Sequence, residues 1–182
     1  MRLAFVDVET TGLEAVEVTS SGLKKVDEFL VRHKPDLRKH AYQAKAFEVN
    51  GYYDGHPDWK NSAVIGSVEA KEDYRKFIAA SKRAMLTAYH LPFDKGFLQA
   101  ELECYGLVPQ WDRRGIELMS YGLLVALDKG LDKMPLHAIY ESLGGPKLPE
   151  HRAMADIERG KFVFMEAHRR FFHGVKTDTP DI

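Results

Sequence analysis

The sequence predicts an α/β fold built on a mixed sheet. Residues 2–8 form a short apolar run that ends in acids, which is typical of a buried strand. Two more strands are expected early, at 14–20 and 26–32, on either side of a turn at 21–22. Farther along the chain, helical and extended segments follow one another. Strands that cluster first and then alternate with helices indicate an α/β domain.

The helices are predicted from their end signals and their periodic hydrophobic residues. Ser67 is a good N-cap, and Glu69 and Glu72 follow it in the first turns, where the helix dipole favours acids. Gly106 and Gly144 are expected to end two later helices. We expect helices over 36–47, 67–82, 93–105, 118–127, 136–143 and 153–172, a strand over 84–89, a strand or helix start at 115–118, and a structured loop over 50–62.

The length and the charge balance limit what the protein can be. The chain has 182 residues, enough to bury a core without disulfides or structural zinc. No linker-like segment divides it, so we expect one domain at 1–173 and a C-terminal tail at 174–182. With 26 Lys and Arg against 27 Asp and Glu, the net charge is −1. A polyanion would therefore have to bind at a local site, with help from a metal.

Cysteine content and hydropathy predict a cytoplasmic protein without a membrane partner. The single cysteine, Cys104, excludes a disulfide framework and fits a reducing compartment. We expect Cys104 to be a small buried hydrophobe within its helix. The apolar start at 3–6 is too short for a signal peptide, and the longest apolar stretch, at 119–127, is too short to cross a bilayer.

The first acidic motif is Asp7-Val8-Glu9-Thr10-Thr11-Gly12, at the end of the first predicted strand. Residues two apart on a strand project from the same face, so Asp7 and Glu9 would lie side by side. Two close carboxylates repel each other unless a cation lies between them, and their hard oxygen atoms suit Mg²⁺ or Mn²⁺. A solvated strand end with both acids in water is the alternative.

Two further acidic motifs follow later predicted elements. Asp94 opens the helix that comes after the strand at 84–89, where it could bind a ligand or simply complement the helix dipole. His151 precedes the last helix, and Asp156 lies in its first turns. From this loop position His151 could reach over a carboxylate site, although a surface histidine and a capping acid would look the same.

Taken together and in this order, the three motifs resemble those of the DEDDh 3′–5′ exonucleases of the ribonuclease H-like superfamily. Relatives of that kind include proofreading epsilon subunits, ribonuclease T and exonuclease X. The resemblance covers residues 1–172 and implies a central mixed five-stranded sheet flanked by helices. His90 departs from the pattern, because it stands where the family usually has Asn. Arg152 stands where the related y branch has Tyr, which excludes that branch.

The resemblance implies a two-metal mechanism with two Mg²⁺ or Mn²⁺ ions about 3.5–4 Å apart. Asp7 would bridge both ions. Glu9 and Asp156 would complete the site that activates the attacking water, and Asp94 would hold the second ion. His151 would be the general base, since the ordinary histidine pKa of about 6.5 suits proton removal near neutral pH.

The resemblance also implies a set of residues that contact the substrate. The backbone at Thr10 would approach the terminal 3′-OH, and Leu13 would wedge against the last base. Core packing is an equal alternative for Leu13, and the core is the favoured place for Phe93. The expected substrate contacts are Thr10, Thr11, Gly12, Leu13, His90 and Phe93.

The function expected from the resemblance is 3′–5′ hydrolysis of nucleic-acid ends, with single-stranded DNA favoured over RNA and with proofreading or repair as the setting. The alternatives are an exoribonuclease of the same branch and a non-catalytic nucleic-acid-binding or polymerase-accessory module. The presence of all four acids and the histidine disfavours the second alternative. No long C-terminal extension indicates a polymerase partner, so we expect a stand-alone enzyme and leave a homodimer open.

Overall fold

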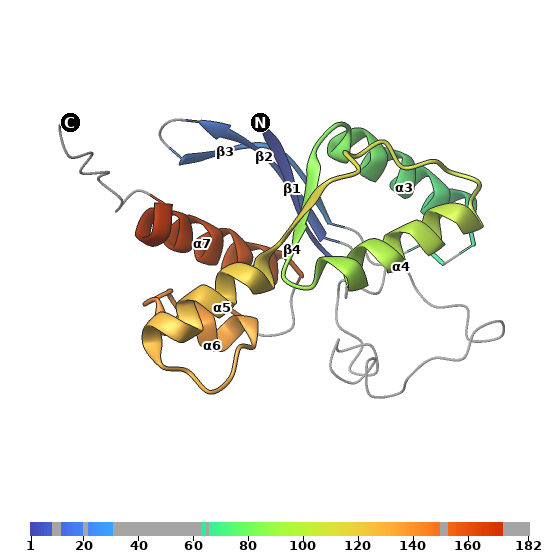
Figure 1. The fold of residues 1–182 in the computed structure, drawn as a ribbon. Helices are drawn as coiled ribbons and strands as arrows, with labels where there is room; N and C mark the ends of the chain where they lie inside the picture. The colour runs from blue at the N-terminus through green and yellow to red at the C-terminus, as the bar shows by residue number, and fades with distance from the viewer. Residues whose placement is uncertain (9–11, 20–21, 31–62, 65, 150–152, 173–182) are drawn as a thin grey trace.

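Five strands form one mixed sheet in the part of the chain that the computed structural model describes, which is residues 1–8, 12–19, 22–30, 63–64, 66–149 and 153–172. They are β1 (Arg2–Asp7), β2 (Gly12–Thr19), β3 (Gly22–Leu30), β4 (Met85–Ala88) and β5 (Gly115–Glu117). Their order is β3-β2-β1-β4-β5, with β1 at the centre. β1 runs antiparallel to β2 and parallel to β4 (Figure 1). β5 runs parallel to β4. The predicted α/β class with a mixed sheet is confirmed.

The early hairpin is present, but its second strand begins earlier than the sequence pattern suggests. β3 begins at Gly22 and not at Val26, and Thr19 pairs with Gly22 at the closed end of the hairpin. The hydroxyl of Thr19 donates a hydrogen bond to the Gly22 carbonyl at 3.0 Å. Gly22 has a φ of +128°, a conformation that favours glycine, so this residue belongs to the turn's exit and starts the strand.

Five helices are described, and they match the predicted ones within a few residues. Ser67 caps the first of them by accepting a hydrogen bond from the Ala70 amide, as expected. The predicted helix at 36–47 and the predicted loop at 50–62 lie outside the described residues. None of the described helices is both long and apolar enough to cross a lipid bilayer. The helices are α3 (Val68–Ser81), α4 (Leu91–Cys104), α5 (Leu118–Lys129), α6 (Leu136–Ser142) and α7 (Ala153–Phe172).

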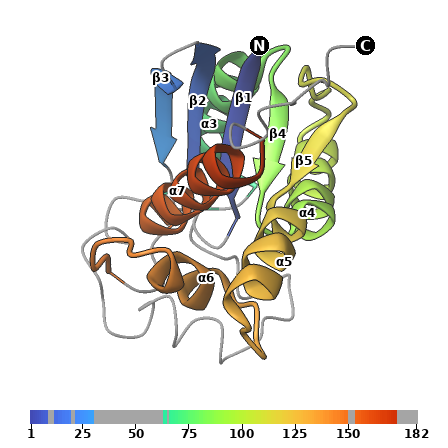
Figure 2. The same ribbon diagram turned by 60° about the vertical axis from the view of Figure 1, so that its left-hand side comes forward.

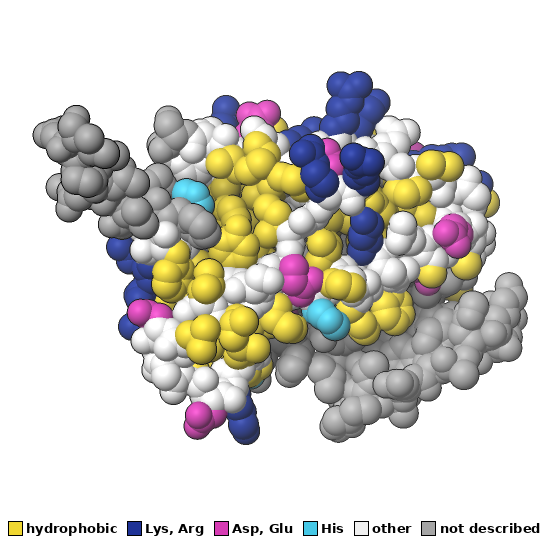
Figure 3. Space-filling view, in the orientation of Figure 1, with side chains coloured by type: hydrophobic (Ala, Val, Ile, Leu, Met, Phe, Trp, Pro, Cys, Tyr) yellow, Lys and Arg dark blue, Asp and Glu magenta, His cyan; other side chains and the backbone are white. Residues whose placement is uncertain are grey.

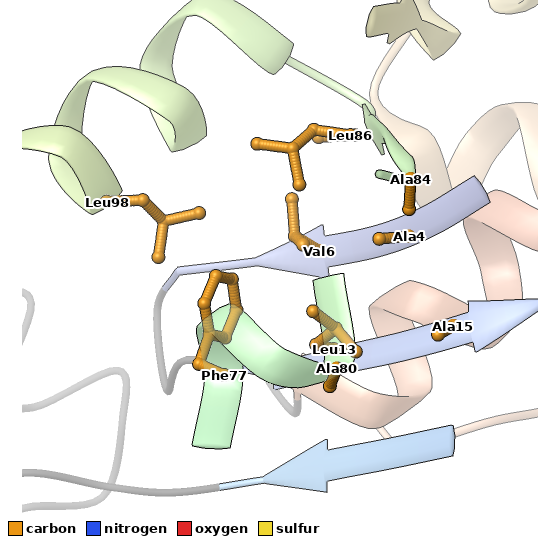
Figure 4. Packing of buried hydrophobic residues seen from close by; sticks show 10 residues of the cluster. Ala4, Val6, Leu13, Ala15, Phe77, Ala80, Ala84, Leu86 and Leu98 are labelled. Atoms are coloured by element: carbon orange, nitrogen blue, oxygen red, sulfur yellow. The ribbon is translucent and has the colours of Figure 1, made fainter. Parts of the chain in front are cut away.

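The sheet is covered on both faces, and the alternation of side chains along β1 decides which residue faces which layer. Ala4 and Val6 pack with Phe77 of α3 and Leu98 of α4 (Figure 4). Leu3 and Phe5 point the other way, into a cluster with residues of α7. α7, with α5 and α6 beside it, therefore lies on the face opposite α3 and α4 (Figure 2).

One expectation about the core is wrong. Cys104 is exposed, because it lies in the last turn of α4 on the side away from the sheet. Its neighbours Leu102 and Tyr105 are the residues that pack inward there.

Gly115 allows β5 to pair closely with β4. A Cβ atom on Gly115 would lie 2.9 Å from the Leu86 carbonyl oxygen and would overlap the Leu91 side chain. Because a strand carbonyl cannot move without breaking the ladder, we expect Gly115→Ala to lower the free energy of unfolding by about 1–3 kcal/mol. Urea denaturation measures this.

The control for that substitution is Gly96→Ala. Gly96 lies inside α4, and nothing stands within 4 Å of the position that its Cβ would take. The variant should be about 0.5–1 kcal/mol more stable than the unaltered chain, because alanine favours the helix. Equal effects at both glycines would contradict the close approach at Gly115.

Candidate active site

The carboxyl end of β1 carries the first candidate residue, Asp7. Because Leu3 and Phe5 face α7, Asp7 two residues further on faces α7 as well. It lines a small pocket together with Thr87 at the end of β4 and Asp156 of α7. One carboxylate oxygen of Asp7 is buried. The fold thus brings together two acids that are far apart in the sequence.

That pocket has a volume of about 20 Å³, enough for one water-sized group. Its walls come from β1, from β4 and the residue after it, and from α5, α6 and α7. It opens at the carboxyl ends of the parallel strands β1 and β4, which is where ligands of α/β proteins characteristically bind.

Asp94 joins α4 to the same end of β1. Its Oδ1 atom accepts a hydrogen bond from the backbone N–H of Val8 at 3.1 Å. The local sequence places it there: Pro92 opens the helix, and the Asp94 amide bonds back to the carbonyl of His90. Only 6% of Asp94 is exposed. Asp94, the third acid, therefore binds the backbone one residue beyond Asp7, at the end of the central strand.

Burial gives Asp94 an unusual protonation behaviour. It raises the pKa of Asp94 from its ordinary value of 3.8 to about 6, against the opposing effects of the Val8 hydrogen bond and of His90. Ionising a buried carboxyl group that contacts neither water nor a cation costs free energy. A divalent ion bound beside Asp94 would remove that cost.

Asp156 lies in the first turn of α7 and is held by a neighbour on the same helix. Its Oδ1 atom lies 2.7 Å from a guanidinium nitrogen of Arg159, an ion pair at i,i+3 spacing. The Asp156 side chain is 25% exposed, whereas that of Arg159 is 6% exposed. Asp156 is therefore open to a ligand on one side and anchored on the other.

The remaining predicted residues fall into four groups. Glu9, Thr10, Thr11 and His151 lie outside the described residues. Gly12 pairs with Asp7 across β1 and β2. Leu13 has no exposed surface and belongs to the core cluster of the α3 face, so packing accounts for it. His90 and Phe93 lie at the start of α4, and both are exposed.

His90, Phe93 and Phe97 form an exposed row of rings along α4, here called the aromatic row. The rings of His90 and Phe93 are stacked, with centroids 6.0 Å apart and an interplanar angle of 13°. The rings of Phe93 and Phe97 are 4.7 Å apart. Phe93 is 51% exposed and Phe97 is 55% exposed, so the favoured core placement of Phe93 is wrong.

Asp94 follows Phe93 directly in the sequence, and its side chain is buried against β1 while the Phe93 ring is exposed. Hydrophobic side chains gather over α4 and α5 on the face seen in Figure 3. Phe97 was not among the residues expected from the sequence. Its spacing of four residues from Phe93 would have placed the two rings together on one helix face.

The described acids suit a hard divalent cation in kind but do not complete a site alone. Carboxylate oxygens are the ligands that Mg²⁺ and Mn²⁺ prefer. Among the residues that the structure describes, no three Asp, Glu, His or Cys side chains are close enough together to bind one ion. Asp7 and Asp156 nevertheless line one pocket, and Asp94 binds the amide of Val8, the residue after Asp7. Glu9 follows Val8 in the sequence, and His151 stands two residues before Ala153.

Comparison with known proteins shows no family for this chain. No protein-family model matches it, and no curated protein matches its sequence significantly. The proposed function therefore rests on the residues described above.

The raised pKa of Asp94 predicts how Asp94→Asn affects stability. Above about pH 6 the carboxyl is ionised in both the folded and the unfolded chain, and the folded chain bears the full cost of the buried charge. Asparagine keeps an oxygen for the Val8 amide without the charge. In EDTA at about pH 8, Asp94→Asn should therefore be more stable than the unaltered chain by about 1–3 kcal/mol.

This advantage should shrink as the pH falls below about 6 and disappear well below 3.8, where Asp94 is protonated in both states. Urea unfolding at several pH values measures it. Mg²⁺ should raise the melting temperature of the unaltered chain and should raise that of Asp94→Asn less. A variant that is no more stable than the unaltered chain in EDTA at about pH 8 would contradict the burial argument.

Proposed function

We propose that this protein is a divalent-metal-dependent 3′–5′ exonuclease of the DEDDh type, with a ribonuclease H-like fold. The observation that carries the proposal is that Asp7 and Asp156 line one pocket at the end of β1, while Asp94 binds the Val8 amide one residue beyond Asp7. These residues come from three motifs spread over the chain. Convergence of this kind follows from shared chemistry more readily than from three independent capping roles.

The architecture supports the same proposal. The resemblance implies a central mixed five-stranded sheet flanked by helices, and the described part of the chain has such a sheet. Asp7 lies at the end of its central strand, at the edge where the parallel neighbour β4 also ends. The arrangement of strands and helices supports the proposal without reference to any individual side chain.

Asp7, Glu9, Asp94 and Asp156 would hold two Mg²⁺ or Mn²⁺ ions, which supply an activated water and stabilise the leaving 3′-oxyanion when they are bound. The role of the protein is to fix the ligands. Backbone pairing with Gly12 holds Asp7, and the Val8 amide holds Asp94.

His151 would remove the proton from the attacking water as the general base. Such a group contributes typically about 10²–10⁴-fold to the rate. His151 comes two residues before the first residue of α7, and Asp156 lies in the first turn of that helix. This spacing carries the assignment of the base.

The aromatic row favours single-stranded nucleic acid as the substrate. Unpaired bases can stack on exposed rings in any sequence, and each contact contributes about 1–3 kcal/mol. Two half-exposed phenylalanines and a stacked His90, beside the acid of α4, provide such a surface. With a net charge of −1, the chain would hold its substrate by stacking and metal contacts more than by general positive charge.

The first test is digestion of 3′-labelled and 5′-labelled single-stranded DNA and RNA of the same sequence, with Mg²⁺ and with EDTA. We expect stepwise shortening from the 3′ end with Mg²⁺, faster for DNA, and none with EDTA. Faster digestion of RNA would make the protein an exoribonuclease. Binding without cleavage of either substrate would indicate the non-catalytic alternative and contradict the proposal.

Active-site variants make this test specific. Asp7→Asn should abolish cleavage, since it removes the bridging ligand, and His151→Ala should lose about 10²–10⁴-fold in kcat while it still binds Mn²⁺. His137→Ala is the control, because His137 is exposed on α6 and does not line the pocket of Asp7 and Asp156, so this variant should keep full activity. If His151→Ala kept its normal rate, another group would be the base.

The aromatic row gives a separate prediction about binding. In the inactive Asp7→Asn background, Phe93→Ser and Phe97→Ser should each weaken the binding of single-stranded DNA by about tenfold, as lost stacking requires. Fluorescence anisotropy of a labelled oligonucleotide measures this. Leu127→Ser is the matched control, since Leu127 is 72% exposed on α5 and carries no ring. Equal losses in all three variants would indicate a general hydrophobic effect.

A further inference from the structure

Arg159 is a charged residue of α7 with almost no contact with water. Its side chain is 6% exposed, although most arginines lie at the surface. A charge in such a place is costly unless several hydrogen bonds satisfy it. The groups that bind the Arg159 guanidinium therefore indicate why a charge is placed there.

The guanidinium of Arg159 binds three acceptors. One terminal nitrogen donates to Asp156 Oδ1 at 2.7 Å. The other donates to the carbonyl oxygens of Leu148 and Pro149, each at 2.9 Å. Arg159 thus joins the first turn of α7 to the chain segment that leads toward it.

Tyr140 of α6 supports this arrangement from the side. The Arg159 guanidinium carbon lies 6.0 Å from the centre of the Tyr140 ring, and the tyrosine hydroxyl donates to the Pro146 carbonyl at 2.7 Å. Gly145 fits against the same ring so closely that a Cβ atom there would overlap it. The segment around Leu148 is therefore packed against both helices.

A second arginine on α7 shows what is special about this one. Arg169 pairs with Glu166 at the same i,i+3 spacing and the same 2.7 Å distance. The Arg169 side chain is 64% exposed, and exposed pairs of this kind contribute little to stability. The two pairs differ in burial, and the buried one has the proposed metal ligand as its acid.

We propose that Arg159 is a positioning residue for Asp156. This inference rests on the proposed function, because it assigns Asp156 to a metal site. The guanidinium holds Oδ1 and the two carbonyls before α7 in one rigid fork, so the carboxylate stays at the pocket that it shares with Asp7. Residues that orient a metal ligand in this way typically change metal affinity by about 10–100-fold when they are replaced.

The test compares Mn²⁺ binding by the full-length unaltered chain with binding by Arg159→Met, Arg159→Lys and Arg169→Met, by isothermal titration. Circular dichroism melting in EDTA first fixes a temperature at which each protein is folded. We expect Arg159→Met to bind Mn²⁺ about 10–100-fold more weakly, with Arg159→Lys between it and the unaltered chain, because lysine keeps the charge without the fork. Arg169→Met should bind normally. In cleavage assays kcat should fall while KM for the oligonucleotide stays unchanged.

Each of the other possible outcomes would overturn the inference. If Arg159→Met is folded and binds Mn²⁺ within about twofold of the unaltered chain, Arg159 only stabilises the fold. If it binds Mn²⁺ more tightly, Arg159 opposes the ion. Either result would overturn the inference while the proposed function stands. If Arg159→Met does not fold, unchanged affinity in Arg159→Lys overturns it equally. If the unaltered chain binds no Mn²⁺, the proposed function and this inference fail together.

Discussion

The hydrogen bond from the Val8 amide to Asp94 holds the candidate site together. β1 ends at Asp7, and the next backbone amide has no partner strand to pair with in the ladder that β1 forms with β4. An amide that is partly shielded from water needs an acceptor, and the first turn of α4 supplies one in Asp94. The same contact fixes the start of α4, and with it the aromatic row, at the end of the central strand. Asp7 faces the opposite layer, so both layers of the domain meet at these two adjacent residues.

The sequence predicted the elements well where local chemistry determines them. The Ser67 cap, the glycine after α4 and the proline that opens it act within a few residues, so α3 and α4 are found within two residues of their expected ends. The three acids at strand and helix ends were also predictable, since the ends of elements are marked in the sequence. The motif order supplied the expectation that they meet.

It was harder to predict which side chains are exposed and which groups they bind, because both depend on distant parts of the chain. Phe93 looks like any core residue in a helix, and only the packing of Asp94 and Leu98 toward the sheet turns its ring outward. Arg159 looks like an ordinary surface residue three positions after an acid. Its burial comes from α6 and from the segment at 148–149, which no local pattern indicates. The start of β3 was predicted four residues too late, because Gly22 can either end a turn or start a strand.

The two edge strands of the described sheet have a consequence for how copies of this chain could associate. β5 has three residues, and β3 presents Lys24, Lys25, Asp27 and Glu28 along its length, all exposed. Short or charged margins resist strand addition from a neighbouring molecule. Self-association by extending the sheet into a continuous ribbon is therefore disfavoured at both margins, which also protects the protein against fibril-like aggregation at high concentration.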